Sequence, residues 1–325
     1  MAIEAQLDQI MQAAVTQRAS DVYWLPTSDG YQILLQAAGK LQSLLQVSTE
    51  TAHQLINHIK YRSNMAISDH RRPQLGAMTL VVEQQTLNLR ISAVGDFLDR
   101  ESLVVRLLYE GQGASLHYLV AEQRHQLSRL MHHTGLILFS GPMGAGKTST
   151  MYDLVREVGE QRLVMTIEDP VEIYEPQFLQ LQVNPPAHMA YTDLLKVGLR
   201  HHPDIFIIGE IRDAETAQIA VQAALSGHLV LSTIHARGVY GIAPRLAQLG
   251  VEPEVLQQAL TAMSYQRLVP LTDGSLATIF DVVTMPNELT TAPTQMMTRK
   301  WGQLIDEQLA AGRLDNETAH QLKEA

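Results

Sequence analysis

The sequence contains no cysteine. This absence excludes disulfide bonds, thiolate nucleophiles and zinc sites built from cysteine, so no zinc is expected as a cofactor. It is also compatible with a reducing compartment such as the cytoplasm.

The sequence also lacks a long apolar run and a basic segment near its start. No stretch approaches the roughly 18 apolar residues that a membrane-spanning helix requires. Residues 1–15, MAIEAQLDQIMQAAV, include Glu4 and Asp8 and predict a short amphipathic helix in place of a signal peptide. We therefore expect a cytoplasmic protein that associates with a membrane only peripherally, through a partner.

Basic residues are outnumbered by acidic ones. The chain has 24 Lys and Arg against 34 Asp and Glu, which gives a formal net charge of −10. Such a surface repels phosphate backbones, so no direct contact with nucleic acid is expected. The simplest interpretation is a soluble surface whose charges repel one another.

The length of 325 residues and the hydrophobic fraction of 46% predict two domains, each with its own core. The strand and helix patterns before residue 110 favour an α+β domain over residues 1–109. The glycine-containing stretch 110–115 indicates a linker, which we place at residues 110–117. In the first domain, the predicted strands are residues 22–25, 31–36, 78–82, 87–92 and 103–108, and the predicted helix is residues 52–61.

Residues 118–325 follow a different pattern, in which strands and helices alternate. The predicted strands are residues 136–140, 163–167, 205–208 and 229–234, and the predicted helices are residues 147–158, 191–201 and 214–225. Strands of this kind are almost wholly apolar, as expected for the centre of a parallel sheet. The alternation predicts an α/β domain with helices on both faces of that sheet.

A phosphate-binding loop stands between the first strand and the first helix of this domain. Gly141-Pro-Met-Gly-Ala-Gly-Lys-Thr148 matches the pattern G-x-x-x-x-G-K-[ST] at every fixed position. The glycines let the backbone curl so that several N–H groups point at a phosphate, and the helix N-terminus adds partial positive charge. Lys147 neutralises phosphate oxygens and Thr148 offers a hydroxyl to Mg²⁺. The strand before the loop and the helix after it support nucleotide binding.

Two further segments carry carboxylates where predicted strands end. Glu168 and Glu210 each follow a buried strand. Ligands of open α/β sheets bind at the carboxyl ends of the strands, so both side chains are expected beside the phosphate loop. A carboxylate there can hold Mg²⁺ or orient the attacking water. Asp169 and Asp213 have a simpler alternative role as N-caps of helices, and we favour it for Asp213.

Two histidines bracket the last predicted strand of this domain. His235 lies at its carboxyl end, within reach of a γ-phosphate, and His228 lies at the opposite end. A histidine at a strand end is more often structural, but the neighbouring phosphate loop favours a functional role for His235. The seven-residue spacing separates the two side chains, so they are not expected to share a metal.

Four blocks in this order resemble the Walker A, Asp box, Walker B and His box motifs of the type II secretion and type IV pilus ATPases. The blocks are GPMGAGKTST, TIEDPVE, PDIFIIGEIRDAETA and GHLVLSTIHA. Shorter segments outside them resemble other signatures of the same family, namely residues 19–22, 71–76, 90–92, 106–108 and 266–268. The resemblance extends from about residue 19 to residue 285.

This resemblance implies an α/β fold class, with a RecA-like P-loop NTPase domain and C-terminal helices in residues 118–325. It implies a smaller, PAS-like α+β domain before them, and ATP and Mg²⁺ as cofactors. The implied nucleotide-binding residues are Gly141, Gly144, Gly146, Lys147, Thr148 and Ser149, with Thr148 and Glu210 at the metal. The implied catalytic residues are Glu168 for the attacking water, Glu210 for Mg²⁺, His235 as γ-phosphate sensor, and Arg90 and Arg106 as arginine fingers. Members of the family work as homo-hexamers whose domains close on ATP and open on release.

Some positions depart from the family pattern. Tyr23 replaces a histidine of the N-terminal signature, and Leu75 replaces an aspartate of the turn at residues 71–76. The four-cysteine zinc element of many secretion ATPases is missing, and a short turn over residues 269–275 takes its place.

Gln182-Val183-Asn184 looks like the Q-V-N of assembly ATPases, and the short form is similar to the ATPases that assemble the competence pseudopilus for DNA uptake in Gram-positive bacteria. Those act through a polytopic membrane platform protein, which becomes the expected partner. The alternatives are a pilus retraction ATPase, a conjugation-type ATPase that translocates DNA or protein, and a scaffold that binds ATP without turnover.

Overall fold

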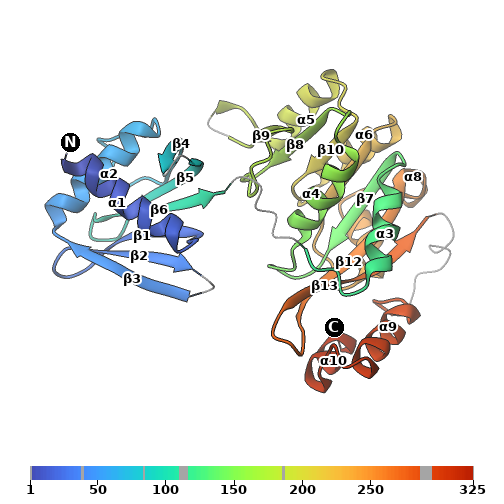
Figure 1. Cartoon of the computed structure of the whole chain (residues 1–325). Coiled ribbons are helices and arrows are strands. Elements are labelled where there is room, and N and C mark those ends of the chain that lie inside the picture. The colour runs from blue at the N-terminus through green and yellow to red at the C-terminus, as the bar shows by residue number, and fades with distance from the viewer. Residues whose placement is uncertain are drawn as a thin grey trace. The chain divides into compact units, whose positions relative to one another are not determined.

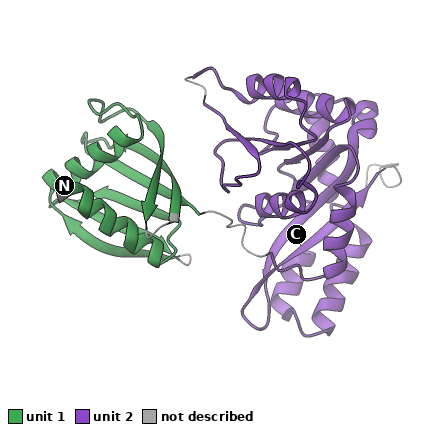
Figure 2. Cartoon of the chain, turned by 45° about the horizontal axis from the view of Figure 1, so that its top comes forward, with its two compact units in different colours: residues 1–112 green, residues 113–325 purple. Residues whose placement is uncertain are grey.

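The computed structural model describes residues 2–37, 40–82, 85–109, 116–184, 187–285 and 295–324. The chain divides into two compact units, residues 1–112 and residues 113–325 (Figure 2). The predicted linker stretch 110–115 lies outside the described residues. Within the described part of the chain, no helix is both long enough and apolar enough to cross a bilayer.

Unit 1 is a six-stranded antiparallel sheet with two helices packed on one face (Figure 1). The strand order is β3-β2-β1-β6-β5-β4. Alternate strand residues such as Val22, Trp24 and Val105 point toward the helices and form one core with Leu7 and Ile56. The elements are α1 (Ala2–Thr16), β1 (Asp21–Pro26), β2 (Tyr31–Ala37), β3 (Lys40–Val47), α2 (Thr49–Arg62), β4 (Gln74–Val82), β5 (Gln85–Gly95) and β6 (Glu101–Leu108).

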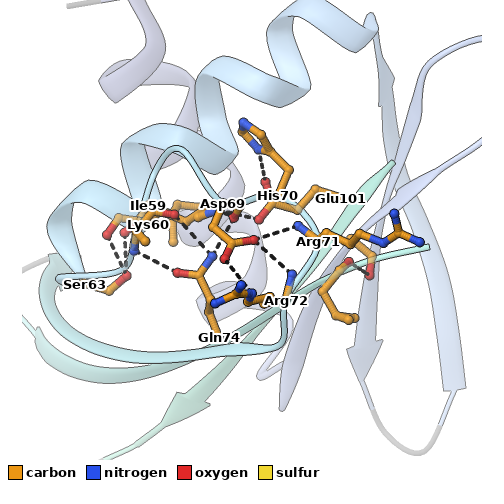
Figure 3. A network of polar contacts seen from close by, with 12 residues as sticks. Ile59, Lys60, Ser63, Asp69, His70, Arg71, Arg72, Gln74 and Glu101 are labelled. Atoms are coloured by element: carbon orange, nitrogen blue, oxygen red, sulfur yellow. Dashed lines mark hydrogen bonds and ion pairs between the residues drawn. The ribbon is translucent and has the colours of Figure 1, made fainter. Parts of the chain in front are cut away.

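A buried polar network joins α2 to the start of β6 (Figure 3). The Lys60 ammonium is completely buried and donates to Glu101 Oε1 at 2.5 Å and to the Asp69 carbonyl at 2.7 Å. His70 Nδ1 lies 2.9 Å from the other oxygen of Glu101, and the Tyr31 hydroxyl donates to the Glu101 carbonyl at 2.8 Å. The network therefore compensates two charges that unit 1 has removed from water.

Unit 2 has a seven-stranded sheet in the order β13-β12-β7-β11-β10-β8-β9. The elements are α3 (Ala121–Leu130), β7 (Gly135–Ser140), α4 (Lys147–Val158), β8 (Val164–Glu168), β9 (Leu179–Gln182), α5 (Tyr191–Arg200), β10 (Ile205–Ile208), α6 (Ala214–Leu225), β11 (Leu229–Thr233), a 3-10 turn (Val239–Gly241), α7 (Ile242–Gln248), α8 (Pro253–Ala259), β12 (Leu260–Pro270), β13 (Leu276–Thr284), α9 (Arg299–Ala310) and α10 (Asn316–Lys323).

Helices cover both faces of this sheet (Figure 1). The wholly buried strand β10 contributes side chains to the hydrophobic core on each face of the sheet, because successive side chains point to opposite faces. Phe206 and Ile208 pack with α5 and α6, whereas Ile205 and Ile207 pack with α3 and α4. The fold is thus the predicted α/β class, which places the carboxyl ends of β7, β8, β10 and β11 along one edge.

The sequence predicts a parallel sheet, but the sheet of unit 2 is not parallel throughout, because one strand pair is antiparallel. The pairs among β7, β8, β9, β10 and β11 are parallel, as is β12 with β7, but β12 and β13 form an antiparallel hairpin at the sheet edge. The turn predicted over residues 269–275 is shorter than expected, because Val269 and Pro270 still belong to β12. Asp273 accepts from the Ser275 backbone, and Gly274 has a φ of +82°, so this tight turn closes the hairpin.

Candidate active site

A cavity of about 480 Å³ lies at the carboxyl ends of the central strands of unit 2. Its walls come from the phosphate loop, the end of β8, the segment after β10 and the end of β11. The lining residues include Met143, Gly144, Ala145, Gly146, Lys147, Thr148, Ser149, Glu168, Asp169, Glu172, Tyr191, Gly209, Glu210, Arg212, Thr233 and His235. This edge is where a parallel α/β sheet binds its ligands.

The phosphate loop needs its glycines for geometric reasons. Gly141, Gly144 and Gly146 have φ angles of +144°, +76° and +83°, a range that residues with a Cβ rarely adopt. A Cβ on Gly141 would lie only 2.2 Å from the Gln266 carbonyl oxygen of β12. Gly146 is the N-cap of α4, so the first backbone N–H groups of that helix face the loop.

Gln266, on strand β12, contacts the phosphate loop on the side away from the cavity. Its side chain is completely buried and its Nε2 donates to the Ala145 carbonyl at 2.6 Å. This contact joins β12 to the loop across 121 positions of sequence. Gln266 belongs to the segment 266–268 that resembles a family signature, and the contact gives that segment a physical role in fixing the loop.

Lys147 folds back onto the loop. Its Nζ donates to the carbonyl oxygens of Gly141 and Pro142, both at 2.9 Å. Burial lowers the pKa of Lys147 below its ordinary value, while the carboxylates of Glu210 and Glu172 act in the opposite direction. The ammonium therefore sits in a partly desolvated position where an anionic ligand would replace weak carbonyl partners.

Glu168 ends β8 and is almost completely buried. Its Oε1 accepts hydrogen bonds from the Tyr152 hydroxyl at 2.6 Å and from the Thr166 hydroxyl at 2.7 Å. The carboxylate lines the cavity but is also anchored to α4 through Tyr152. Two donors on one oxygen restrict how this carboxylate can turn.

Glu210 bridges two cationic or potentially cationic partners. Its Oε1 lies 2.7 Å from His235 Nε2, and its Oε2 accepts from Arg212 Nε at 2.6 Å. The hydrogen bond to Glu210 raises the pKa of Arg212 above its ordinary value. The segments that follow β10 and β11 are thus in direct contact through Glu210 and His235.

Hydrogen bonds between two side-chain hydroxyls and the backbone join the strand ends at the cavity. The Ser140 hydroxyl, at the end of β7, donates to the Ala236 carbonyl and accepts from the Ala236 N–H, both at 3.0 Å. The Thr233 hydroxyl donates to the Gly209 carbonyl at 2.7 Å. The end of β11 is therefore tied to both neighbouring strand ends, which fixes the positions of Glu210 and His235.

The structure brings most of the sequence-predicted residues into this one cavity. Gly144, Gly146, Lys147, Thr148, Ser149, Glu168, Glu210 and His235 line it, and Gly141 begins the loop behind it. His228 lies at the other end of β11, where its ring contacts Phe206 and its Nδ1 lies 3.0 Å from the Ala223 carbonyl. Asp213 is an N-cap, as favoured, because its Oδ1 accepts from the Thr216 N–H at 2.8 Å.

Arg90 and Arg106 belong to unit 1. They are directly opposite one another on β5 and β6 and lie on the face of the sheet that α1 and α2 leave uncovered. Arg106 Nε donates to Asp21 Oδ1 on β1 at 2.8 Å. The two arginines are therefore neighbours on one sheet face.

Several residues at the cavity have contacts or roles there that the sequence did not predict. Arg212 and Tyr191 line the cavity, and Tyr152 and Gln266 anchor its parts. Arg212 stands two positions after Glu210, so its proximity was readable from the motif. Tyr152 lies on α4, four positions after Thr148, but its contact with Glu168 depends on the fold. Tyr191 and Gln266 come from segments distant in the sequence.

The α/β fold and the phosphate loop that lines the cavity define a nucleotide-binding protein of the P-loop class. The profile of the family described as "Type II/IV secretion system protein" matches residues 1–314. The chain belongs to this family, as the motifs predicted, and is an ATP-binding enzyme that hydrolyses ATP. Members of the family typically form hexamers.

Two relatives and one solved structure illustrate the similarity. Competence protein ComGA of Streptococcus pneumoniae is 38% identical over 261 residues, which cover 80% of this chain and 83% of the relative. Competence protein ComGA of Bacillus subtilis is 38% identical over 274 residues, covering 83% and 77%. The pilus retraction motor PilT with bound ADP shares the fold, with a TM-score of 0.76 and 21% identity over 97% of this chain and 96% of that one.

Proposed function

We propose that this chain hydrolyses ATP to power assembly of a competence pseudopilus. It works as a cytoplasmic homo-hexamer that associates with the membrane through a polytopic platform protein. One observation carries the proposal. A chain that is 38% identical to two ComGA competence proteins has Lys147, Glu168, Glu210 and His235 around a single cavity.

The phosphates of ATP occupy the loop at Gly144 to Thr148. Lys147 exchanges its two carbonyl partners for β- and γ-phosphate oxygens, a stronger charge-assisted interaction. The hydroxyl of Thr148 and the carboxylate of Glu210 are oxygen donors of the kind that Mg²⁺ prefers, and both line the cavity, so these residues fit the metal. When bound, Mg²⁺ neutralises charge on the phosphates.

Four side chains then act on the γ-phosphate and the water. Glu168 orients the attacking water, because its carboxylate is held in a fixed direction at the cavity wall. His235 senses the γ-phosphate through its contact with Glu210, which changes when the glutamate turns toward a bound nucleotide. Arg90 and Arg106 act as arginine fingers once the ring is assembled.

The test is ATP turnover per chain measured over a range of protein concentrations. The unchanged protein, Lys147→Ala and Lys196→Ala are compared, since Lys196 is an exposed lysine of the same unit outside the cavity. We expect turnover per chain to rise with concentration in the unchanged protein and in Lys196→Ala, and to vanish in Lys147→Ala.

Near-normal turnover in Lys147→Ala would contradict the assignment of the nucleotide site. Turnover that does not change with concentration down to the monomer, checked by light scattering, would contradict the requirement for assembly.

A further inference from the structure

Tyr152 occupies an unusual position for a buried tyrosine. It lies on α4, one helical turn after Thr148, so one helix face carries both a phosphate-loop residue and the tyrosine. The side chain is completely buried, and its hydroxyl reaches Glu168 Oε1 at 2.6 Å. The helix that begins at the phosphate loop is thus connected to the carboxylate at the end of β8.

The direction of the Tyr152 hydrogen bond follows from Gln180 on β9. The Gln180 Oε1 accepts from the Glu175 backbone N–H at 2.8 Å, which fixes the amide orientation. Its Nε2 must therefore face the Ile173 carbonyl and the Tyr152 oxygen, each at 2.7 Å. Since the tyrosine oxygen already accepts from Gln180, its own proton is directed to Glu168.

Tyr152 remains a donor at all ordinary pH values. Burial, followed by the charge of the Glu168 carboxylate, raises the pKa of Tyr152 well above its usual range. The ring is also fixed from two sides, with the Phe178 ring centroid at 5.5 Å and the Arg156 guanidinium 5.9 Å from the ring centroid. The hydroxyl therefore has one position and one role in this packing.

We propose that Tyr152 is a positioning residue that holds the Glu168 carboxylate in the orientation needed to direct the attacking water. It does so by occupying Oε1 together with Thr166. Because α4 also carries Lys147 and Thr148, the same helix determines the positions of both the bound phosphate and the Glu168 carboxylate. This inference rests on the proposed role of Glu168, and its test separates the two.

The experiment measures kcat, KM for ATP and the pH dependence of kcat on the full chain at a concentration that gives maximal turnover. The variants are Tyr152→Phe, Thr166→Val, Glu168→Gln and the double variant of Tyr152→Phe with Glu168→Gln. The matched control is Tyr118→Phe. The Tyr118 hydroxyl also donates to a carboxylate of α4, because it lies 2.8 Å from Oδ2 of Asp153, the residue after Tyr152.

For Tyr152→Phe we expect kcat to fall about tenfold, the scale of one hydrogen bond to a charged group, with KM for ATP within about twofold. Loss of a donor favours the protonated carboxyl, so the acid-side midpoint of the pH profile rises by about one pH unit. Thr166→Val shifts the midpoint in the same direction. Tyr118→Phe leaves kcat and the profile unchanged, and Tyr152→Phe adds no further loss to Glu168→Gln.

The outcomes distinguish the proposals. If Glu168→Gln is inactive while Tyr152→Phe keeps the kcat and pH profile of the unchanged protein, the positioning role is wrong and the role of Glu168 stands. If Glu168→Gln keeps its turnover, the water-orienting role of Glu168 is wrong, and the inference falls with it. A fall in kcat for Tyr152→Phe without a shift of the pH profile would mean a general packing effect and would also overturn the inference.

Discussion

Replacing Gly141 by alanine should damage the nucleotide site through sterics. The new Cβ would lie 2.2 Å from the Gln266 carbonyl oxygen, closer than real Cβ contacts come. Neither partner can withdraw easily, because Gly141 follows β7 directly and β7 pairs with β12 at Ser140 and Tyr265. The loop or the hairpin must therefore shift.

Two costs add at this position. A φ of +144° imposes about 1 to 3 kcal/mol on a residue with a side chain, and overpacking at a rigid contact costs about 1 to 3 kcal/mol. The sum is about 4 kcal/mol, which lowers the Tm of a unit of this size by roughly 10 °C. Gly144→Ala provides the comparison, since its Cβ would meet nothing within 4 Å. It should cost only the left-handed backbone strain of about 1 to 2 kcal/mol.

The assay is calorimetric unfolding of the nucleotide-free protein, together with the affinity for a fluorescent ATP analogue. We expect one transition for each unit, because each has a core of its own. We expect the unit 2 transition to fall at least twice as far in Gly141→Ala as in Gly144→Ala. Equal shifts in the two variants would refute the steric reasoning, and wild-type stability in Gly141→Ala would refute the geometry of the loop.

Two further predictions concern unit 1. Lys60→Met leaves the buried Glu101 carboxylate without its main partner, so it should destabilise unit 1 by about 3 to 5 kcal/mol, visible as a lower Tm for that unit alone. An unchanged unit 1 transition would mean that the pair is dispensable. Asp21→Asn weakens the anchor of Arg106 and should lower kcat several-fold with little change in KM, whereas Asp96→Asn, which breaks another aspartate–arginine pair of unit 1, should leave kcat unchanged. Equal kcat values for the two variants would argue against Arg106 as a finger.

Much of the fold could be predicted because local and global signals agree. The helix predicted at residues 214–225 has those bounds in the structure, since Asp213 caps it and its apolar residues match the helical period. The strand at residues 205–208 is likewise as predicted, because a short, fully apolar run suits the centre of a parallel sheet. By contrast, β3 was not predicted, since its mostly exposed side chains lack a clear alternation.

In the site too, some residues could be predicted from the sequence and others could not. Residues that touch phosphate in every P-loop follow a fixed spacing, so Lys147 and Thr148 were readable from the sequence. The contacts that anchor them are not local. Gln266 reaches the loop from β12, and Tyr152 meets Glu168 from another element, so no spacing rule reports either contact. Such partners become visible only when the strand order is known.

The role of this ATPase in pseudopilus assembly is best tested in cells. The gene is deleted and replaced by a copy encoding the unchanged chain, Lys147→Ala or the exposed-site control Lys196→Ala, and surface pseudopili are counted by labelling a pilin subunit. We expect pseudopili with the unchanged chain and the control, and none with Lys147→Ala at equal protein level. As many pseudopili with Lys147→Ala, or more of them as expected from a failed retraction motor, would contradict this role.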